Sequence, residues 1–135
     1  MEEVLKLDLD IKNFDIVQKI VVNRCGVFNF ALKGIRPVGL KVASTQHGYH
    51  IYMTVECERE LSNFDVCFLQ MTLGSDYKRE CYNYSRFIDR LDKKWNVLFS
   101  VKYDGNNNVS SLETDEPMLS AVLLKTIEER LKREI

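Results

Sequence analysis

A strictly alternating segment near the N-terminus, residues 5–11, constrains the fold more than any other feature of the sequence. Apolar and charged side chains alternate through it, which is typical of a β-strand with one buried face. The apolar set is Leu5, Leu7, Leu9 and Ile11, and the charged set is Lys6, Asp8, Asp10 and Lys12. Because two carboxylates on one strand face can share a divalent cation, we expect Asp8 and Asp10 to bind Mg²⁺ or Mn²⁺.

The composition predicts a single folded domain over residues 1–135. Hydrophobic residues make up 45% and charged residues 29% of the chain, which argues against disorder. The net charge of −1 excludes the overall basic field of a nucleic-acid coat protein, so a nucleic-acid role needs a local patch. No apolar stretch approaches the roughly 20 residues of a membrane span, and the acidic N-terminus differs from the basic start of a signal peptide. We expect a soluble, intracellular (cytoplasmic) protein without a membrane partner.

The four cysteines, at positions 25, 57, 67 and 81, form no Cys-x-x-Cys pair. Only His47 and His50 could add ligands, so the spacing disfavours a structural zinc site. Buried free thiols are the favoured interpretation. A disulfide stays open if the source is a hyperthermophile.

The order of the elements predicts an α+β fold. Strands are expected at 4–11, 38–44, 49–57 and 95–103, and helices from a cap at Asn13 or Asp15 to Gly26, at 61–73 closed by Gly74, at 76–91 and at 117–134. Residues 27–33 fit a further helical turn or two. The order is β-α-β-β-α-(α)-β-α, whose first six main elements match the ferredoxin-like (RRM-like) βαββαβ pattern. This predicts a four-stranded antiparallel sheet with helices on one face, an open second face and an extra C-terminal helix.

Strand parity predicts which side chains the open face carries. They are Lys6, Asp8, Asp10, Lys41, His50, Tyr52, Thr54, Glu56, Ser100 and Lys102. A ferredoxin-like fold places the first and third strands side by side, so Asp8 and Asp10 should lie near His50. Acids, an imidazole and lysines on one surface suit a metal-bound phosphate. The alternative is a solvated face, because antiparallel sheets often have one polar side.

Two short motifs resemble the catalytic core of the archaeo-eukaryotic primase, or primase-polymerase, superfamily. Asp8-Leu9-Asp10 matches the Asp-x-Asp of that family's first core strand. Residues 44–50 (STQHGYH) match its Ser-Gly-x-x-Gly-x-His motif at Ser44, Gly48 and His50. The resemblance covers about residues 4–104. It implies that Asp8, Asp10 and His50 are catalytic, that the two acids hold Mg²⁺ or Mn²⁺, and that Ser44, Gly48 and His50 bind nucleotide phosphate with charge neutralisation by Lys102.

The chain also departs from this family's pattern. Thr45 replaces the first glycine of the second motif, and Gln46 stands where a basic residue is common. The expected later strand, residues 97–102, carries no third acid before Asp104. The resemblance therefore implies a reduced relative that binds nucleotide or single-stranded DNA in DNA replication, and it leaves open whether the domain is an enzyme.

The predicted helix at 76–91 interleaves basic and aromatic residues. Lys78, Tyr82, Arg86 and Arg90 recur at intervals of four and share one helix face. With Arg79, these basic residues could bind a nucleic-acid backbone by displacing its counterions. The alternative is a solvated amphipathic helix whose tyrosines are half buried.

Two further functions stay open. A rolling-circle nicking endonuclease would use a ferredoxin-like core, a histidine pair and a helical tyrosine such as Tyr77, Tyr82 or Tyr84. However, His47 and His50 are three residues apart, so a strand would point them to opposite faces. The second alternative is a non-enzymatic protein-interaction module. The apolar stripe of the last helix would then form a homodimer instead of packing on its own domain.

Overall fold

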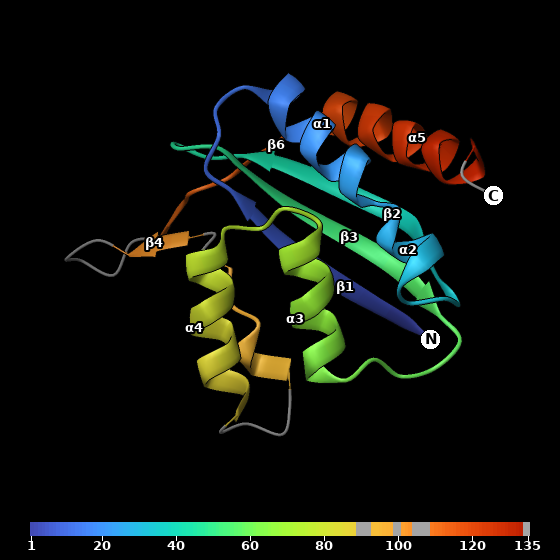
Figure 1. The fold of residues 1–135 in the computed structure, drawn as a ribbon. Helices are drawn as coiled ribbons and strands as arrows, with labels where there is room; N and C mark the ends of the chain where they lie inside the picture. The colour runs from blue at the N-terminus through green and yellow to red at the C-terminus, as the bar shows by residue number, and fades with distance from the viewer. Residues whose placement is uncertain (89–92, 99–100, 104–108, 134–135) are drawn as a thin grey trace.

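The alternating segment forms the edge strand of a four-stranded antiparallel sheet. The computed structural model describes residues 1–88, 93–98, 101–103 and 109–133. The strands, in spatial order, are β1 (Glu2–Leu9), β3 (Tyr49–Cys57), β2 (Ile35–Ser44) and β6 (Thr114–Asp115). Together with the helices, including one at the C-terminus, they confirm the expected α+β class and are consistent with a ferredoxin-like layout (Figure 1).

One face of this sheet carries the core, as the alternation predicted. Leu5, Leu7 and Leu9 of β1 are at most 2% exposed, and the apolar residues of β3 and β2 join them. Three helices cover this face: α1 (Phe14–Arg24), α3 (Asn63–Thr72) and α5 (Pro117–Arg133). The short α2 (Val27–Phe30) follows α1, and α4 (Tyr77–Ile88) lies beside α3 (Figure 1).

The helix boundaries follow local signals in the sequence. The Asn13 side chain accepts a hydrogen bond from the Asp15 backbone N–H at 3.0 Å and caps α1. At the start of α3, Ser62 and Asp65 form a reciprocal capping box. Gly74 follows α3 with φ of 109°, a conformation that favours glycine, as expected for the residue that closes this helix.

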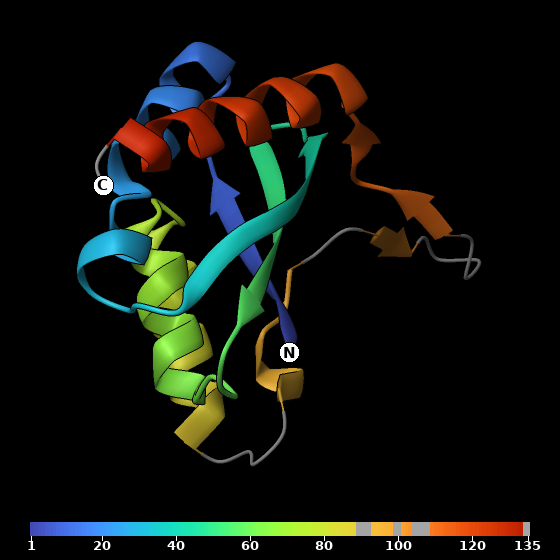
Figure 2. The same ribbon diagram turned by 90° about the vertical axis from the view of Figure 1, so that its right-hand side faces the viewer.

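The expected strand at 95–103 is wrong. Trp95 ends a 3₁₀ turn, η1 (Lys93–Trp95), and its buried indole packs edge-on against Phe87 at 5.2 Å between ring centroids. Farther on, β4 (Val101–Tyr103) pairs with β5 (Val109–Ser111) in a separate two-stranded sheet. Figure 2 shows η1, β4 and β5 on the side of the main sheet opposite α3. The fourth strand of the main sheet is β6, which pairs with β2 and not with β1.

The free edge of β1 is closed by α3, α4 and the residues that connect them instead of by a strand. The Lys6 N–H donates to Gln70 Oε1 at 2.9 Å, and the Asp8 N–H donates to Ser75 Oγ at 3.0 Å. The Lys6 carbonyl accepts from Arg79 Nη1 at 2.8 Å, and the Asp8 carbonyl accepts from the Asp76 N–H at 2.6 Å. These bonds satisfy donors and acceptors that a neighbouring strand would use. The Asn96 carbonyl accepts instead from the Lys6 side chain, at 3.1 Å.

The Gln70 side chain is the centre of this closure. Its Oε1 also accepts from Asn96 Nδ2 at 2.8 Å, and its Nε2 donates to Glu80 Oε1 at 2.9 Å. The Glu80 carboxylate forms an ion pair with Arg79, whose Nη2 donates to Asn96 Oδ1 at 3.0 Å. Gln70 and Glu80 are fully buried. We name Gln70, Ser75, Arg79, Glu80 and Asn96 the β1-edge network.

The cysteines and the helices bear on two further expectations from the sequence. All four cysteines are free, and three of them are buried, while Cys81 is exposed. Within the described residues, none of the helices has the length and apolar character needed to cross a membrane.

We expect Gln70→Ala to lower the free energy of unfolding by about 3 kcal/mol, because the Lys6 N–H, Asn96 and Glu80 each lose a buried partner. Urea denaturation followed by circular dichroism measures this change. Gln18→Ala, which removes the same side chain from a half-buried position of α1, is the matched control and should change stability by less than about 1 kcal/mol. Equal losses in both variants would contradict a special role for the β1-edge network.

Candidate functional site

Asp8 and His50 lie opposite each other on the polar face of the sheet. The β1–β3 register pairs these two residues directly, as strand parity predicted. His50 Nε2 is 3.7 Å from Asp8 Oδ1, and His50 Nδ1 is 2.7 Å from Glu113 Oε1. His50 is only 7% exposed, and the Glu113 carboxylate that contacts it is also largely buried. Thus an imidazole is held between two carboxylates at the surface of the sheet.

Glu113 is a site residue that the sequence did not reveal. It lies just before the two-residue strand β6, whose pairing with Ala43 and Ser44 brings it beside His50. Glu113 also accepts a hydrogen bond from the Tyr52 hydroxyl. Burial and this carboxylate raise the pKa of Tyr52 well above its usual range, so the phenol is a donor at neutral pH. A strand of two residues has no readable periodicity, and 63 residues separate Glu113 from His50.

The environment of Asp8 favours its protonated form. Burial is the largest cause and the nearby charge of Asp10 is the next, and together they raise the pKa of Asp8 to about 6. The charges of His50 and Arg79 act in the opposite direction. Asp10 lies just past the end of β1 and is exposed. The two carboxylates are therefore close enough to repel each other, as a shared cation site requires.

A cavity of about 330 Å³ opens between Asp8 and α4. Its lining residues are Asp8, His50, Asp76, Lys78, Arg79, Tyr82, Arg86, Val97 and Leu98. Lys78, Tyr82 and Arg86 come from one face of α4, as their spacing of four predicted. The cavity therefore has acids and an imidazole on its sheet side and cations around an exposed phenol on its helix side. We name it the α4 cavity.

The basic residues predicted to bind nucleic acid differ in their surroundings. Lys78 and Arg86 reach the α4 cavity, and Arg86 Nη1 also donates to Asn83 Oδ1 at 3.1 Å. Arg79 is turned inward, its guanidinium bonded to Glu80 and to the carbonyls of Lys6 and Val97. Its role in the structure is to close the β1 edge. Arg90 lies outside the described residues.

The residues predicted to bind phosphate are not all brought together. The Ser44 hydroxyl donates to Glu116 Oε1 at 3.0 Å, at the start of α5. The Gly48 N–H donates to Thr45 Oγ1, and a Cβ at Gly48 would lie 2.0 Å from the Leu9 carbonyl oxygen. Glycine is therefore needed at position 48 because the β2–β3 turn presses against the end of β1.

The remaining predicted residues lie apart from the site or add no further ligand to it. Lys102 lies on β4, paired with Ser110 outside the main sheet, so its expected place on the open face of the main sheet is wrong. His47 is exposed in the β2–β3 turn. No group of three or more His, Cys, Asp or Glu side chains is placed to hold one metal ion in the part of the chain that the structure describes. The expected metal site therefore consists of Asp8 and a single neighbouring side chain.

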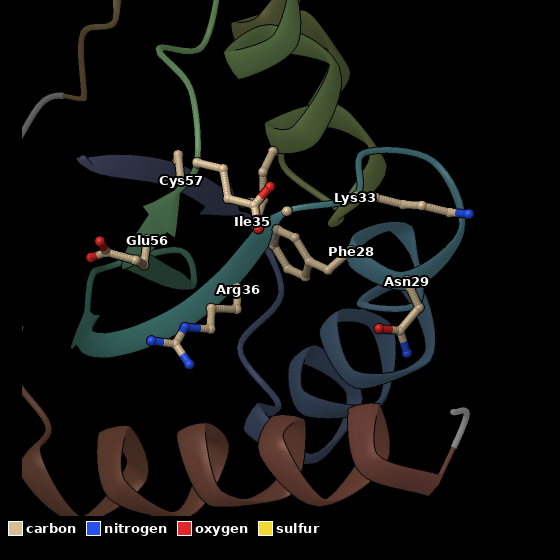
Figure 3. A pocket seen from close by; sticks show the side chains of 9 residues that line it. Phe28, Asn29, Lys33, Ile35, Arg36, Glu56 and Cys57 are labelled. Atoms are coloured by element: carbon tan, nitrogen blue, oxygen red, sulfur yellow. The ribbon is translucent and has the colours of Figure 1, made fainter.

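A larger cavity, of about 590 Å³, lies at the far end of β2 and β3 from Asp8. Figure 3 shows the Phe28 ring inside it and Lys33 pointing away from it. Arg36 and Glu56, which line it, are register partners on β2 and β3. Acidic and basic side chains both line it, and no histidine is among its lining residues. The α4 cavity, although smaller, is therefore the better candidate for a functional site.

Comparisons with protein-family models, with curated proteins and with solved structures returned no match to this chain. A function for this chain is therefore inferred from the geometry of its site.

We expect Asp8→Asn to become progressively more stabilising as the pH rises from 4 to 7. The Asp8 carboxyl has a pKa of about 6 in the folded protein and near 4 when unfolded. The folded state therefore binds more protons in this interval, so wild-type stability falls as the pH rises, and the full penalty remains above pH 6. The variant lacks this penalty. Because solvent screens the partly exposed Asp8 carboxylate, we expect a gain on the order of 1 kcal/mol at pH 7, well below the roughly 3 kcal/mol of the unscreened shift.

Urea denaturation at half-unit pH steps measures the difference between variant and wild type. Asp15→Asn is the control, because Asp15 is exposed in the first turn of α1, where a carboxylate stabilises the helix. Its difference should be small and of the opposite sign. A pH-independent difference for Asp8→Asn would refute the raised pKa.

Proposed function

We propose that this domain binds a phosphate-bearing ligand, a nucleotide or a short stretch of single-stranded DNA, in the α4 cavity. The observation that carries the proposal is the pairing of Lys78, Tyr82 and Arg86 on one wall with Asp8 and His50 on the other. Ammonium and guanidinium groups bind phosphate oxygens, and the lysine and arginine lie on either side of an aromatic ring.

The proposed roles follow from the position of each side chain. Lys78 and Arg86 neutralise the phosphate, and each contact releases a condensed counterion. The Tyr82 side chain is 67% exposed and offers its ring to an unpaired base, with Val97 and Leu98 as the apolar wall. Asp8 and Asp10 hold Mg²⁺ or Mn²⁺ against the phosphate, in the manner that the resemblance to primases implies.

The proposal is restricted to binding. The chain lacks the third acid that primases carry on a later core strand. In addition, β4, at the end of the segment expected to carry this acid, is not part of the main sheet. Four free thiols suit a reducing compartment, so we propose an intracellular location.

The alternative function, a homodimer formed through α5, has narrower support. Leu123 and Ile127 of this helix are fully buried in their own domain. Met118 and Val122 remain exposed at 82% and 52% and are the apolar surface available for pairing.

We expect Lys78→Ala/Arg86→Ala to weaken binding of a fluorescent single-stranded oligothymidylate at least tenfold in low salt. The slope of log K against log salt should fall by about 1.4, because two phosphate contacts are lost on a single strand. Tyr82→Ala should also weaken binding, since stacking of one base on an aromatic ring contributes roughly 1–3 kcal/mol.

Fluorescence anisotropy in EDTA, with circular dichroism to confirm folding, measures these changes without metal. Lys19→Ala/Lys125→Ala removes two exposed lysines from α1 and α5 and is the charge-matched control. Wild-type protein that binds neither the oligonucleotide nor a nucleoside triphosphate in low salt would exclude the proposed function.

The alternative predicts a dimer mass in light scattering at micromolar concentration. Met118→Glu/Val122→Glu should convert that dimer to a monomer, because two charges would be buried at the contact. A wild-type monomer at these concentrations rules out the alternative.

A further inference from the structure

The His50 ring is oriented by a carboxylate on one side and faces a second carboxylate on the other. Glu113 Oε1 accepts from the Tyr52 hydroxyl and lies 2.7 Å from His50 Nδ1. A carboxylate accepts hydrogen bonds, so this contact assigns the proton of the neutral ring to Nδ1. In the neutral ring, Nε2 then presents its lone pair toward Asp8.

The Nε2–Asp8 contact is too long for a hydrogen bond. The 3.7 Å between Nε2 and Oδ1 exceeds the 2.7–3.2 Å of such bonds, and Nε2 has no hydrogen-bond partner among the described residues. Two ligands on one ion, with bonds near 2.1 Å and a tetrahedral angle, lie about 3.4 Å apart. A small side-chain adjustment would therefore let one ion bind both atoms.

We infer that His50 Nε2 and Asp8 Oδ1 together bind a divalent transition-metal ion, with Glu113 as the carboxylate that orients the imidazole. Metal-binding histidines commonly donate their other N–H to a carboxylate, which fixes the ring and increases its basicity. Asp10 and Asp76 add negative charge near Asp8. Solvent, or the phosphate of the ligand, completes the coordination.

The imidazole ligand sets the class of ion. Nitrogen ligands suit zinc, cobalt and similar ions, whereas Mg²⁺ prefers oxygen. The site should therefore bind Zn²⁺ most tightly, then Co²⁺ and Mn²⁺, with Mg²⁺ weakest. This inference deepens and rests on the proposed function, since it adds the His50 imidazole as a ligand of the ion that Asp8 holds in the same cavity.

Calorimetric titration of the full chain with each metal chloride, without nucleotide, tests the inference. Saturable binding of one Zn²⁺ and one Mn²⁺, at least tenfold tighter for Mn²⁺ than for Mg²⁺, is the expected result. Asp8→Asn should abolish this binding, and Glu113→Gln should weaken it about tenfold because the imidazole becomes less basic. Asp115→Asn is the control, since that exposed carboxylate pairs with Lys41 on the neighbouring strand.

A measurement on the wild-type protein does not depend on the folding of variants. Mn²⁺ should broaden the His50 imidazole resonances in NMR spectra at substoichiometric amounts, before those of His47. Equal affinity for Mg²⁺ and Mn²⁺, no saturable binding, or unbroadened His50 resonances would each overturn the inference. Because oligonucleotide binding is measured in EDTA and metal binding without nucleotide, failure of one is distinguishable from failure of the other.

Discussion

The hydrogen bonds between the edge of β1 and the β1-edge network are the constraint on which the rest of the structure depends. Gln70 accepts from the Lys6 main-chain N–H and Arg79 donates to the Lys6 carbonyl, the two groups that would otherwise pair with a neighbouring strand. This closure buries a charged pair, Arg79 and Glu80, at a desolvation cost that only complete hydrogen bonding offsets. Each member of the network has several partners, so the arrangement of α3 and α4 beside β1 is specific.

The position of the site follows from this closure. Because no strand pairs with β1 on its outer side, α4 approaches the edge, and its Lys78–Tyr82–Arg86 face lies across from Asp8. The chain then crosses to the other side of the sheet and returns as β6 beside β2, which brings Glu113 to His50. The site is thus assembled from five separate segments, and several of its contacts also stabilise the fold.

Local patterns predicted the elements well and their pairing less well. The alternation at 5–11, the cap at Asn13 and the closing Gly74 all depend on neighbours in sequence, and the structure has each of them. The prediction of one strand over 95–103 failed because alternating apolar residues indicate burial but not the surface against which they are buried. Trp95 is buried against Phe87 and not within a sheet. Gly48 was interpreted as part of a phosphate motif, but its close approach to Leu9 is a packing requirement that no motif reveals.

The sequence by itself determined that Asp8 and His50 share the polar face of adjacent strands and that Lys78, Tyr82 and Arg86 share a helix face, because strand and helix periodicities are local properties. Only the tertiary structure decided that these two faces meet across one cavity, that Arg79 turns inward, and that Glu113 orients His50. Those outcomes depend on which groups satisfy the open edge of β1 and on where a two-residue strand pairs. Both are settled by contacts between residues some 60 or more positions apart, and such contacts leave no periodic trace in the chain.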